Sequence, residues 1–280
     1  MKKNLEIIIL LVVIGSTALG QSLNEQTPYV ILVSFDGFRH DYSSIIDTPN
    51  FDKVEKNGVK AKSLIPVFPS LTFPNHYAIA TGCYANKHRI ISNTFYSKIL
   101  DRTYSMYDRS TITDSSFYGA EPIWVTAEKN GIKTATYFWV GSEAKINDYR
   151  PSYYKYYDPN VSAIEKIDTA IDWLELPTNQ RPGLILLYFN EPDHSGHVYG
   201  SSSKEVIEQV KKSDEILGYL ISSINTLNIA QNINIIVVSD HGMADISNNR
   251  IIELEDFIKD EYLVDGKGPI VQLRDTKKNK

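Results

Sequence analysis

Four short segments of the chain predict the strands of a central β-sheet. They are rich in aliphatic, β-branched and aromatic residues. The run Ile233–Val238 holds five apolar β-branched residues interrupted only by Asn234, a pattern typical of a strand buried on both faces. The other three predicted strands are Tyr29–Phe35, Lys133–Phe138 and Gly183–Phe189.

Helical periodicity occupies much of the chain between these strands. In Ser162–Leu176, and in a long segment that begins at Ser203, apolar residues recur at the spacing of one helix face. The expected core-facing residues are Ile164, Ile167, Ile171 and Leu174 in the first segment and Ile207, Val210, Leu217, Leu220 and Ile224 in the second.

Capping signals and shorter patterns indicate the remaining elements. Thr48 as N-cap and Pro49 at the first helical position predict a helix that ends before Gly58. Further helices are predicted at Glu121–Asn130, at Glu253–Lys259 and around Tyr77–Ala80, the last ending near Gly82. We expect Val59–Val67 to be extended and Arg89–Tyr118 to form loops with short strands.

Alternation of strands and helices predicts an α/β fold, with a mostly parallel central sheet that carries helices on both faces. The length of 280 residues fits one large domain or two modest ones. Hydrophobic residues make up 42% of the chain and charged residues 22%, which permits a large core. The single cysteine, Cys83, excludes an intrachain disulfide, so stability must come from that core.

Residues 1–20 resemble an export signal, with two lysines followed by an apolar run and small residues. The apolar run is short for a permanent anchor, so we expect no stable membrane span after cleavage and a secreted or periplasmic protein. Cleavage would remove two lysines and one glutamate and change the formal charge from −5 to −6. An acidic chain without a basic tract argues against nucleic acid as a bulk partner.

Three of the predicted strands are followed by an aspartate, namely Asp36, Asp193 and Asp240. The carboxyl ends of strands in an open α/β sheet are where ligands bind. Three clustered carboxylates repel one another and require positive charge, and Arg39 is the one basic side chain in these strand-end motifs. Two zinc ions would supply four positive charges.

Two histidines and a threonine extend this hypothesis. His197 follows Asp193 at a D-x-x-x-H spacing and His241 follows Asp240 directly, so each pair offers zinc ligands. Thr72 or Ser70 precedes the predicted helix near Tyr77, and a hydroxyl at a helix N-terminus lies where bound anions are favoured. Metal coordination can remove the proton of a threonine hydroxyl and make it a nucleophile.

Each of these elements has an ordinary structural interpretation when it is taken singly. A threonine before a helix is usually an N-cap, and Asp-Gly and Asp-His-Gly sequences often form turns. His76 and His194 are interpreted as structural residues. The combination of the motifs in one chain is what favours a catalytic site.

The same motifs resemble a known family, the ectonucleotide pyrophosphatase/phosphodiesterases of the alkaline phosphatase superfamily. The resemblance extends from about Tyr29 to Met243 and rests on VSFDGFRHDY, FPSLTFPNHYAIATG, EPDHSGHVYG and VVSDHGM. It implies an alkaline-phosphatase-like fold, a catalytic domain over residues 21–280, and a zinc-dependent hydrolase of small phosphodiesters and pyrophosphates, with nucleotides as the favoured substrates.

The resemblance also implies roles for individual residues. One zinc would be held by Asp36, Thr72, Asp240 and His241, and the other by Asp193 and His197. Thr72 would form a phosphothreonine intermediate, and Asn93 would donate to a non-bridging phosphate oxygen. Phe73 and Tyr157 would form an aromatic pair around a nucleobase or other leaving-side group.

Three departures from the family pattern bear on this interpretation. The second zinc site of the family takes a further downstream histidine, but no histidine follows His241, so the sequence is expected to end before the family domain does. Leu71 stands where nucleotide-cleaving members often carry lysine, and Val140 replaces a usual proline.

Alternative functions follow from these departures. A non-catalytic relative that binds metal or phosphoester is the alternative from a different class. A sulfatase is disfavoured because the sequence after Cys83 lacks the proline and arginine of the sulfatase motif, and a monoesterase because no extra positive charge is evident.

Overall fold

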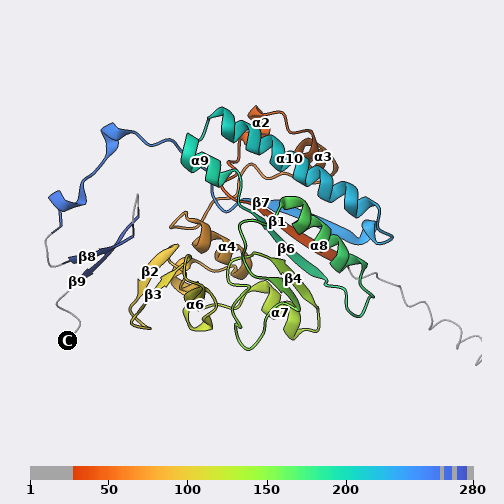
Figure 1. Ribbon diagram of the computed structural model, residues 1–280, viewed down its shortest axis with the longest axis horizontal. Helices are drawn as coiled ribbons and strands as arrows, with labels where there is room; N and C mark the ends of the chain where they lie inside the picture. Colours follow the sequence, from red (N-terminus) through yellow and green to blue (C-terminus); the bar gives the residue numbers. More distant parts are fainter. Residues whose placement is uncertain (1–27, 259–261, 267–269, 276–280) are drawn as a thin grey trace, which may run out of the picture.

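A computed structural model describes residues 28–258, 262–266 and 270–275, so the predicted export signal lies outside the described residues. Its centre is a five-stranded sheet in the order β5-β4-β6-β1-β7, in which every neighbouring pair is parallel (Figure 1). The strands are β1 (Tyr29–Phe35), β4 (Thr134–Tyr137), β5 (Tyr153–Lys155), β6 (Leu184–Phe189) and β7 (Ile233–Val238). The predicted parallel sheet is confirmed, and β5 is an additional strand.

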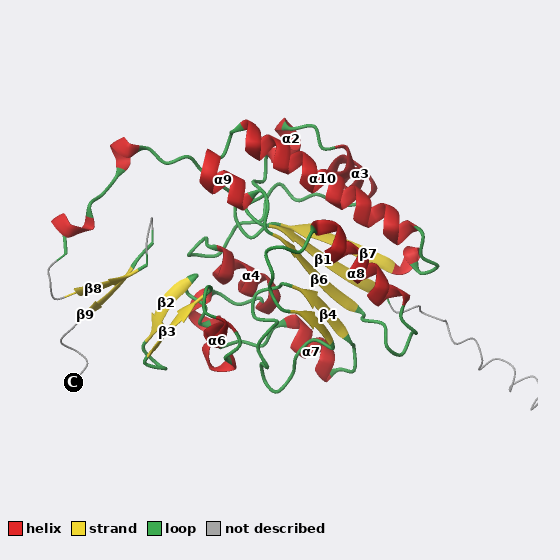
Figure 2. Cartoon of the chain, viewed as in Figure 1, coloured by secondary structure: helices red, strands yellow, loops and turns green. Residues whose placement is uncertain are grey.

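Helices cover both faces of this sheet (Figure 2). In β1, Ile31, Val33 and Phe35 face one core with α8 and α10, whereas Val30 and Leu32 pack into a second core with α4 and α7. The strands are apolar on both faces because each face meets a helical layer. These helices, with α3 on the side of α10, are α3 (Pro49–Asn57), α4 (Thr72–Thr81), α7 (Ile123–Lys129), α8 (Ala163–Glu175) and α10 (Lys204–Asn225).

Shorter elements complete the fold. The predicted loops and short strands of Arg89–Tyr118 are observed, the strands being the antiparallel pair β2 (Thr94–Ser97) and β3 (Arg102–Ser105), and the region also contains two short helical turns that were not predicted. A second antiparallel pair, β8 (Tyr262–Asp265) and β9 (Gln272–Asp275), lies beside β2 and away from the main sheet (Figure 1). The other helical segments are α2 (Tyr42–Ile45), α5 (Ala85–His88), α6 (Arg109–Ile112), η1 (Ser115–Phe117), α9 (Asp193–Tyr199), η2 (Ala230–Asn232), η3 (Asn248–Arg250) and η4 (Leu254–Asp256).

The prediction that Ile233–Val238 is buried on both faces is wrong. Strand β7 lies at the edge of the sheet within the described residues, and Ile236 is 48% exposed. Ile233, Ile235 and Val237 do pack against the core shared with α8 and α10. An apolar run alone therefore did not distinguish a central strand from an edge strand covered mainly on one face.

The predicted core faces of α8 and α10 are confirmed except at one residue in each helix. In α8, Ile164 is 45% exposed while Lys166 is buried. In α10, Ile207 is 37% exposed and its neighbour Val206 is buried, because Val206 and not Ile207 lies on the stripe with Val210 and Leu217.

The predicted helix Glu253–Lys259 is also not observed. The structure has only the 3-10 turn η4 at Leu254–Asp256, and Lys259 lies outside the described residues. Phe257 and Ile252 are exposed there, so no apolar face is buried that could stabilise a longer helix.

Candidate active site

Three adjacent strands bring the three predicted aspartates to one edge of the sheet. Asp36 follows β1, Asp240 follows β7, and Asp193 is the first residue of α9 after β6. Backbone contacts fix their positions, since the Asp193 amide donates to the Asp36 carbonyl at 3.0 Å and the Gly37 amide donates to Asp240 Oδ1 at 3.1 Å. Gly37 adopts φ 67°, and a Cβ there would come within 2.8 Å of Asp193, so this close approach requires glycine.

His241 lies at the centre of these carboxylates. Its Nε2 is 3.2 Å from Asp240 Oδ2, 3.5 Å from Asp36 Oδ1 and 4.0 Å from Asp193 Oδ1. The same nitrogen is 3.4 Å from Thr72 Oγ1. One donor atom each of Asp36, Asp240 and His241 lie within 4.8 Å of one another, a spacing suited to a metal ion.

One oxygen of each aspartate in this cluster is buried without a hydrogen-bond partner. These atoms are Asp36 Oδ1, Asp193 Oδ1 and Asp240 Oδ2, the same oxygens that surround His241 Nε2. Arg39 does not neutralise them, because its guanidinium pairs with Asp41 at 2.6 Å. Unpaired buried carboxylate oxygens are costly, so the donor set fits a divalent cation.

Two aspartates of the cluster have pKa values shifted in opposite directions. Burial raises the pKa of Asp36 well above its usual range, and the charges of Asp240 and Asp193 raise it further. Burial would also raise the pKa of Asp240, but the contacts with His76 and His241 lower it to about 2. Burial raises the pKa of Asp193. The site is thus an anionic cluster that a cation would stabilise.

Asp193 and His197 share one face of α9. His197 Nε2 lies 3.4 Å from Asp193 Oδ1, and the two residues occupy positions i and i+4 of the helix. The His197 side chain is 70% exposed, so this pair opens to solvent. Among the described residues, the group of three or more metal donors includes neither Asp193 nor His197.

Thr72 is the first residue of α4, with its hydroxyl directed toward His241. The helix begins five residues before the apolar segment at Tyr77 and ends at Thr81 with Gly82 as its C-cap, which confirms the predicted end near Gly82. The N-cap alternative for Thr72 is wrong, because Leu71 occupies the cap position and no side chain caps the helix. The hydroxyl is therefore free for other chemistry.

The orientation of Asn93 is set by the backbone next to Thr72. Asn93 Oδ1 accepts a hydrogen bond from the Phe73 amide at 2.9 Å. Because the carbonyl end of the Asn93 amide is used in this way, its NH₂ end is left to donate elsewhere.

The two predicted aromatic residues approach the site from different elements. Phe73 follows Thr72 in α4 and packs edge-on against Tyr104. Tyr157 packs edge-on against Phe138, and its amide donates to Glu143 Oε1 at 2.8 Å. Burial raises the pKa of Tyr157, and the charge of Asp36 raises it further.

Two further contacts were missed by sequence reasoning. The Tyr188 hydroxyl donates to Asp36 Oδ2 at 2.6 Å, and His76 Nδ1 lies 3.3 Å from Asp240 Oδ2. Tyr188 could have been suspected as a site residue, because it carries a hydroxyl near the carboxyl end of the apolar run Gly183–Phe189. His76 had no such signal, because its partners come from distant parts of the chain.

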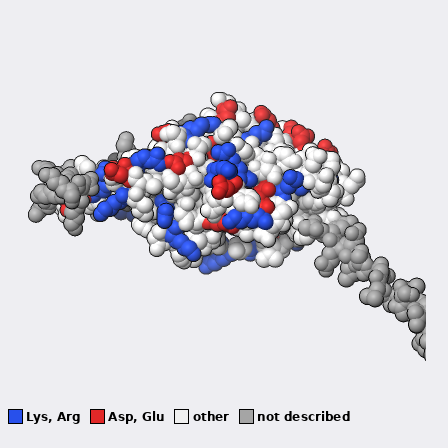
Figure 3. All heavy atoms as spheres, turned by 90° about the horizontal axis from the view of Figure 1, so that it is seen from below, with Lys and Arg blue, Asp and Glu red and all other residues white. Residues whose placement is uncertain are grey.

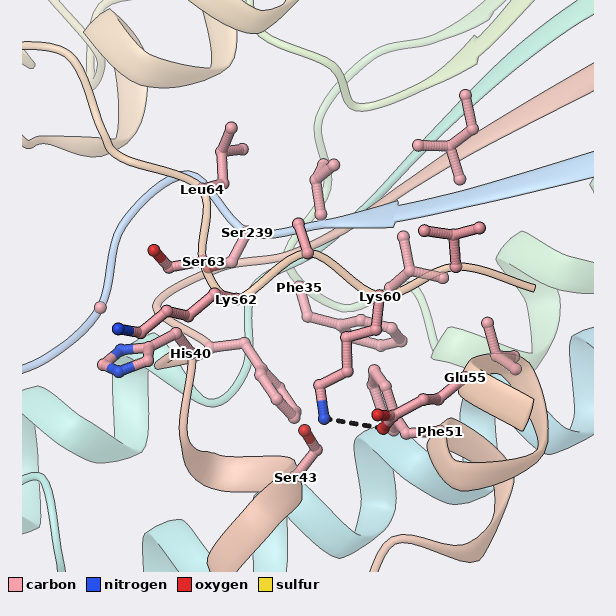
Figure 4. A pocket seen from close by; sticks show the side chains of 18 of the residues that line it. Phe35, His40, Ser43, Phe51, Glu55, Lys60, Lys62, Ser63, Leu64 and Ser239 are labelled. Carbon is pink, nitrogen blue, oxygen red and sulfur yellow. Dashed lines mark hydrogen bonds and ion pairs between the residues drawn. The ribbon is translucent and has the colours of Figure 1, made fainter. Parts of the chain in front are cut away.

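A groove of about 630 Å³ adjoins this cluster (Figure 4). It is lined mainly by apolar residues of β7 and of the extended segment 59–66, and Lys60 pairs with Glu55 at its rim. Of the residues in the cluster, His241 alone reaches it. The groove therefore runs along the edge strand β7, and the three aspartates do not line it.

The surface charges agree with the composition. Figure 3 shows acidic and basic side chains interspersed on the face that it draws. A mixed surface of this kind differs from the basic face typical of nucleic-acid binding. Within the described residues, no helix has the length and apolarity needed to span a bilayer.

Comparisons with known proteins agree with the fold and the motifs. Residues 30–280 match the sequence model of the family described as type I phosphodiesterase / nucleotide pyrophosphatase. The chain is 38% identical to a venom phosphodiesterase of Macrovipera lebetinus over 259 residues, which is 91% of this chain and 30% of that protein. It is also 38% identical to human ectonucleotide pyrophosphatase/phosphodiesterase family member 1, over 86% of this chain and 27% of that protein. The chain thus spans about 30% of the length of these curated relatives.

A solved structure gives the same result at the level of the fold. Murine ectonucleotide pyrophosphatase/phosphodiesterase 5, an inactive threonine-to-alanine variant in complex with AMP, superimposes with a TM-score of 0.84 at 35% identity. The match covers 89% of this chain and 66% of that one. The sheet with helices on both faces is accordingly the fold of that structure. The chain belongs to the type I phosphodiesterase / nucleotide pyrophosphatase family.

Proposed function

We propose that this chain hydrolyses small phosphodiesters and pyrophosphates, with Thr72 as the nucleophile. The observation that carries the proposal is the convergence of three unpaired carboxylate oxygens and the Thr72 hydroxyl around His241 Nε2. Family membership supports phosphodiester hydrolysis as the reaction class.

The proposed cofactor is a pair of zinc ions. Asp36, Asp240, His241 and Thr72 would hold one ion, and Asp193 with His197 would contribute to the other. When bound, zinc supplies positive charge that lowers the pKa of a coordinated hydroxyl and polarises a phosphoryl oxygen. The three aspartate oxygens without a hydrogen bond support this assignment, because all three lie within 4.0 Å of His241 Nε2.

The residues of the chain would then divide the reaction between them. Thr72 Oγ1 forms a bond to phosphorus as the bond to the leaving oxygen breaks, which gives a phosphothreonine. Water cleaves this ester in a second displacement and regenerates the hydroxyl. The NH₂ of Asn93 donates to a non-bridging oxygen, in the orientation that the Phe73 amide imposes on its carbonyl end.

A nucleotide is the proposed substrate class. The neighbouring murine structure is a complex with AMP. Phe73 and Tyr157 would provide the aromatic surfaces for a base or another leaving-side group. Nucleotide-cleaving members of the family often carry a lysine at the position of Leu71. The substrate of this chain would therefore meet no positive charge at that position. Secretion or periplasmic export is proposed from the sequence of residues 1–20 and from the venom relatives.

A non-catalytic relative that binds metal or phosphoester is the second candidate. It is favoured by one observation, that among the described residues the group of three metal donors contains neither Asp193 nor His197. The second ion would then have Asp193 and His197 as its donors within the described residues, and its site would bind weakly.

Hydrolysis of the nitrophenyl ester of thymidine monophosphate tests the proposal. We expect turnover that requires zinc, stops with chelator, and falls at least about 10³-fold in Thr72→Ala. Thr81→Ala is the matched control, since Thr81 lies at the other end of α4 and its hydroxyl bonds only the Tyr77 carbonyl and the Cys83 amide. Zinc binding without turnover would instead support the non-catalytic alternative.

A further inference from the structure

His76 is a buried side chain that contacts three of the segments from which the active site is built. It is fully buried and lies one turn after Thr72 in α4. Its Nδ1 is 2.9 Å from the Thr72 carbonyl and 3.3 Å from Asp240 Oδ2, and its Nε2 is 2.8 Å from Ser34 Oγ, two residues before Asp36 in β1. One imidazole thus joins α4, the end of β7 and the end of β1.

The partners of His76 define which ring nitrogen carries the proton. A carbonyl and a carboxylate face Nδ1, and neither can donate, so Nδ1 must carry the hydrogen. Ser34 has a hydroxyl that can donate to Nε2. The Nδ1–H group donates to the Thr72 carbonyl and also contacts Asp240 Oδ2. The imidazole therefore connects the first turn of α4, which carries the Thr72 hydroxyl, to the Asp240 carboxylate.

Aromatic packing holds the imidazole ring in this orientation. Trp139 and Tyr188 both pack edge-on against it, with ring centroids 5.2 and 5.1 Å away. The Trp139 indole also donates to the His76 carbonyl at 3.0 Å. A close-packed ring with partners on both nitrogens cannot rotate without breaking several contacts.

We propose that His76 is a positioning residue, which fixes the Thr72 hydroxyl relative to Asp240 through its Nδ1–H. This role rests on the proposed function. It differs from a catalytic role because the ring nitrogens contact the Thr72 carbonyl, Asp240 Oδ2 and Ser34 Oγ, so that His76 would act on the Thr72 hydroxyl through these groups.

Two amide substitutions separate the contributions of the two ring nitrogens. Asn places a side-chain N–H near the position of Nδ1, whereas Gln places its amide near the position of Nε2. We expect His76→Ala and His76→Gln to lower kcat about 10- to 100-fold, with KM little changed, and to weaken zinc affinity by a similar factor. His76→Asn should recover most of both quantities.

His88→Asn is the matched control for the loss of a buried histidine. His88 is also fully buried, at the end of α5, and its Nδ1 accepts a hydrogen bond from the Ile90 amide. We expect it to lower the melting temperature while kcat and zinc affinity stay at wild-type values. Equal kcat and zinc affinity in His76→Ala and His88→Asn would overturn the positioning role, as would equal rescue by Asn and Gln.

Nitrogen NMR of the metal-free chain provides a readout that does not depend on activity. Long-range proton–nitrogen correlations of labelled histidine should identify the Nδ1–H tautomer at His76. An Nε2–H tautomer would overturn the inference even if the enzyme is active. A wild-type chain that neither binds zinc nor hydrolyses the ester would instead overturn the proposed function, and the role of His76 with it.

Discussion

At the scale of single residues, neighbouring groups shift the pKa values of two buried aspartates in the cluster in opposite directions. Asp36 and Asp240 are both buried, yet the pKa of Asp36 is raised and that of Asp240 is lowered to about 2. Burial raises the pKa of both residues, and the difference arises from their neighbours. Two histidines lower the pKa of Asp240, whereas the charges of Asp240 and Asp193 raise that of Asp36 and the Tyr188 hydroxyl opposes this rise only in part. The aspartates of the cluster could be identified from the sequence, but the direction in which each pKa is shifted could not.

Removal of the Tyr188 hydroxyl should therefore weaken zinc binding in a pH-dependent way. That hydroxyl lowers the pKa of Asp36, so Tyr188→Phe raises it further and protons compete better with zinc as the pH falls. We expect a loss of affinity of about tenfold at pH 6 and a smaller loss at pH 8, measured by competition with a chelator.

Tyr153→Phe is the control for this change, because the Tyr153 hydroxyl donates to the Gln180 carbonyl and not to an aspartate. If Tyr188→Phe and Tyr153→Phe had the same zinc affinity at both pH values, the link from Tyr188 to the site through Asp36 would be refuted.

At the scale of elements, the sequence predicted the existence of strands and long helices better than the faces that they bury. The strands Tyr29–Phe35 and Ile233–Val238 have the predicted bounds, because both runs are short and rich in β-branched or aromatic residues, which favours a strand over a helix. In α8 the predicted Ile167 and Leu174 are buried, but the rotation of the helix leaves Ile164 exposed and buries Lys166, which was not a candidate for burial. Tertiary packing decides that rotation.

The buried Lys166 gives a prediction for α8. Burial lowers the pKa of this lysine from 10.5 to about 8, and its Nζ lies 3.2 Å from the Tyr188 carbonyl. The unfolded chain then binds more protons than the folded chain between about pH 8 and 10.5, so the free energy of unfolding should rise with pH across this window, by at most about 3 kcal/mol.

Lys166→Met should remove this rise, which denaturant titrations at pH 7.5 and pH 10 can measure. Lys211→Met, at an exposed position of α10, is the control and should keep the wild-type difference. A wild-type chain and a Lys166→Met chain with the same pH dependence would show that this lysine is not destabilised by burial.

At the scale of the whole molecule, strand order is what assembles the candidate site. Asp36, Asp193 and Asp240 are separated by up to 204 positions in sequence, yet they follow three neighbouring strands, β1, β6 and β7. Parallel strands place all their carboxyl ends at one edge, so their proximity could be predicted from the sequence. The roles of His76 and Tyr188 could not, because a hydrogen bond between distant segments has no periodic signature.

The measurement that most directly tests the central claim is a search for the covalent intermediate on Thr72. The zinc-loaded chain would be mixed with the nitrophenyl ester of thymidine monophosphate, quenched in acid during turnover, and digested for mass spectrometry. We predict a thymidylate adduct on the peptide that contains Thr72, and its absence in Thr72→Ala and in chelator-treated protein. Turnover with no adduct on Thr72, or with an adduct on another residue, would contradict the proposed mechanism.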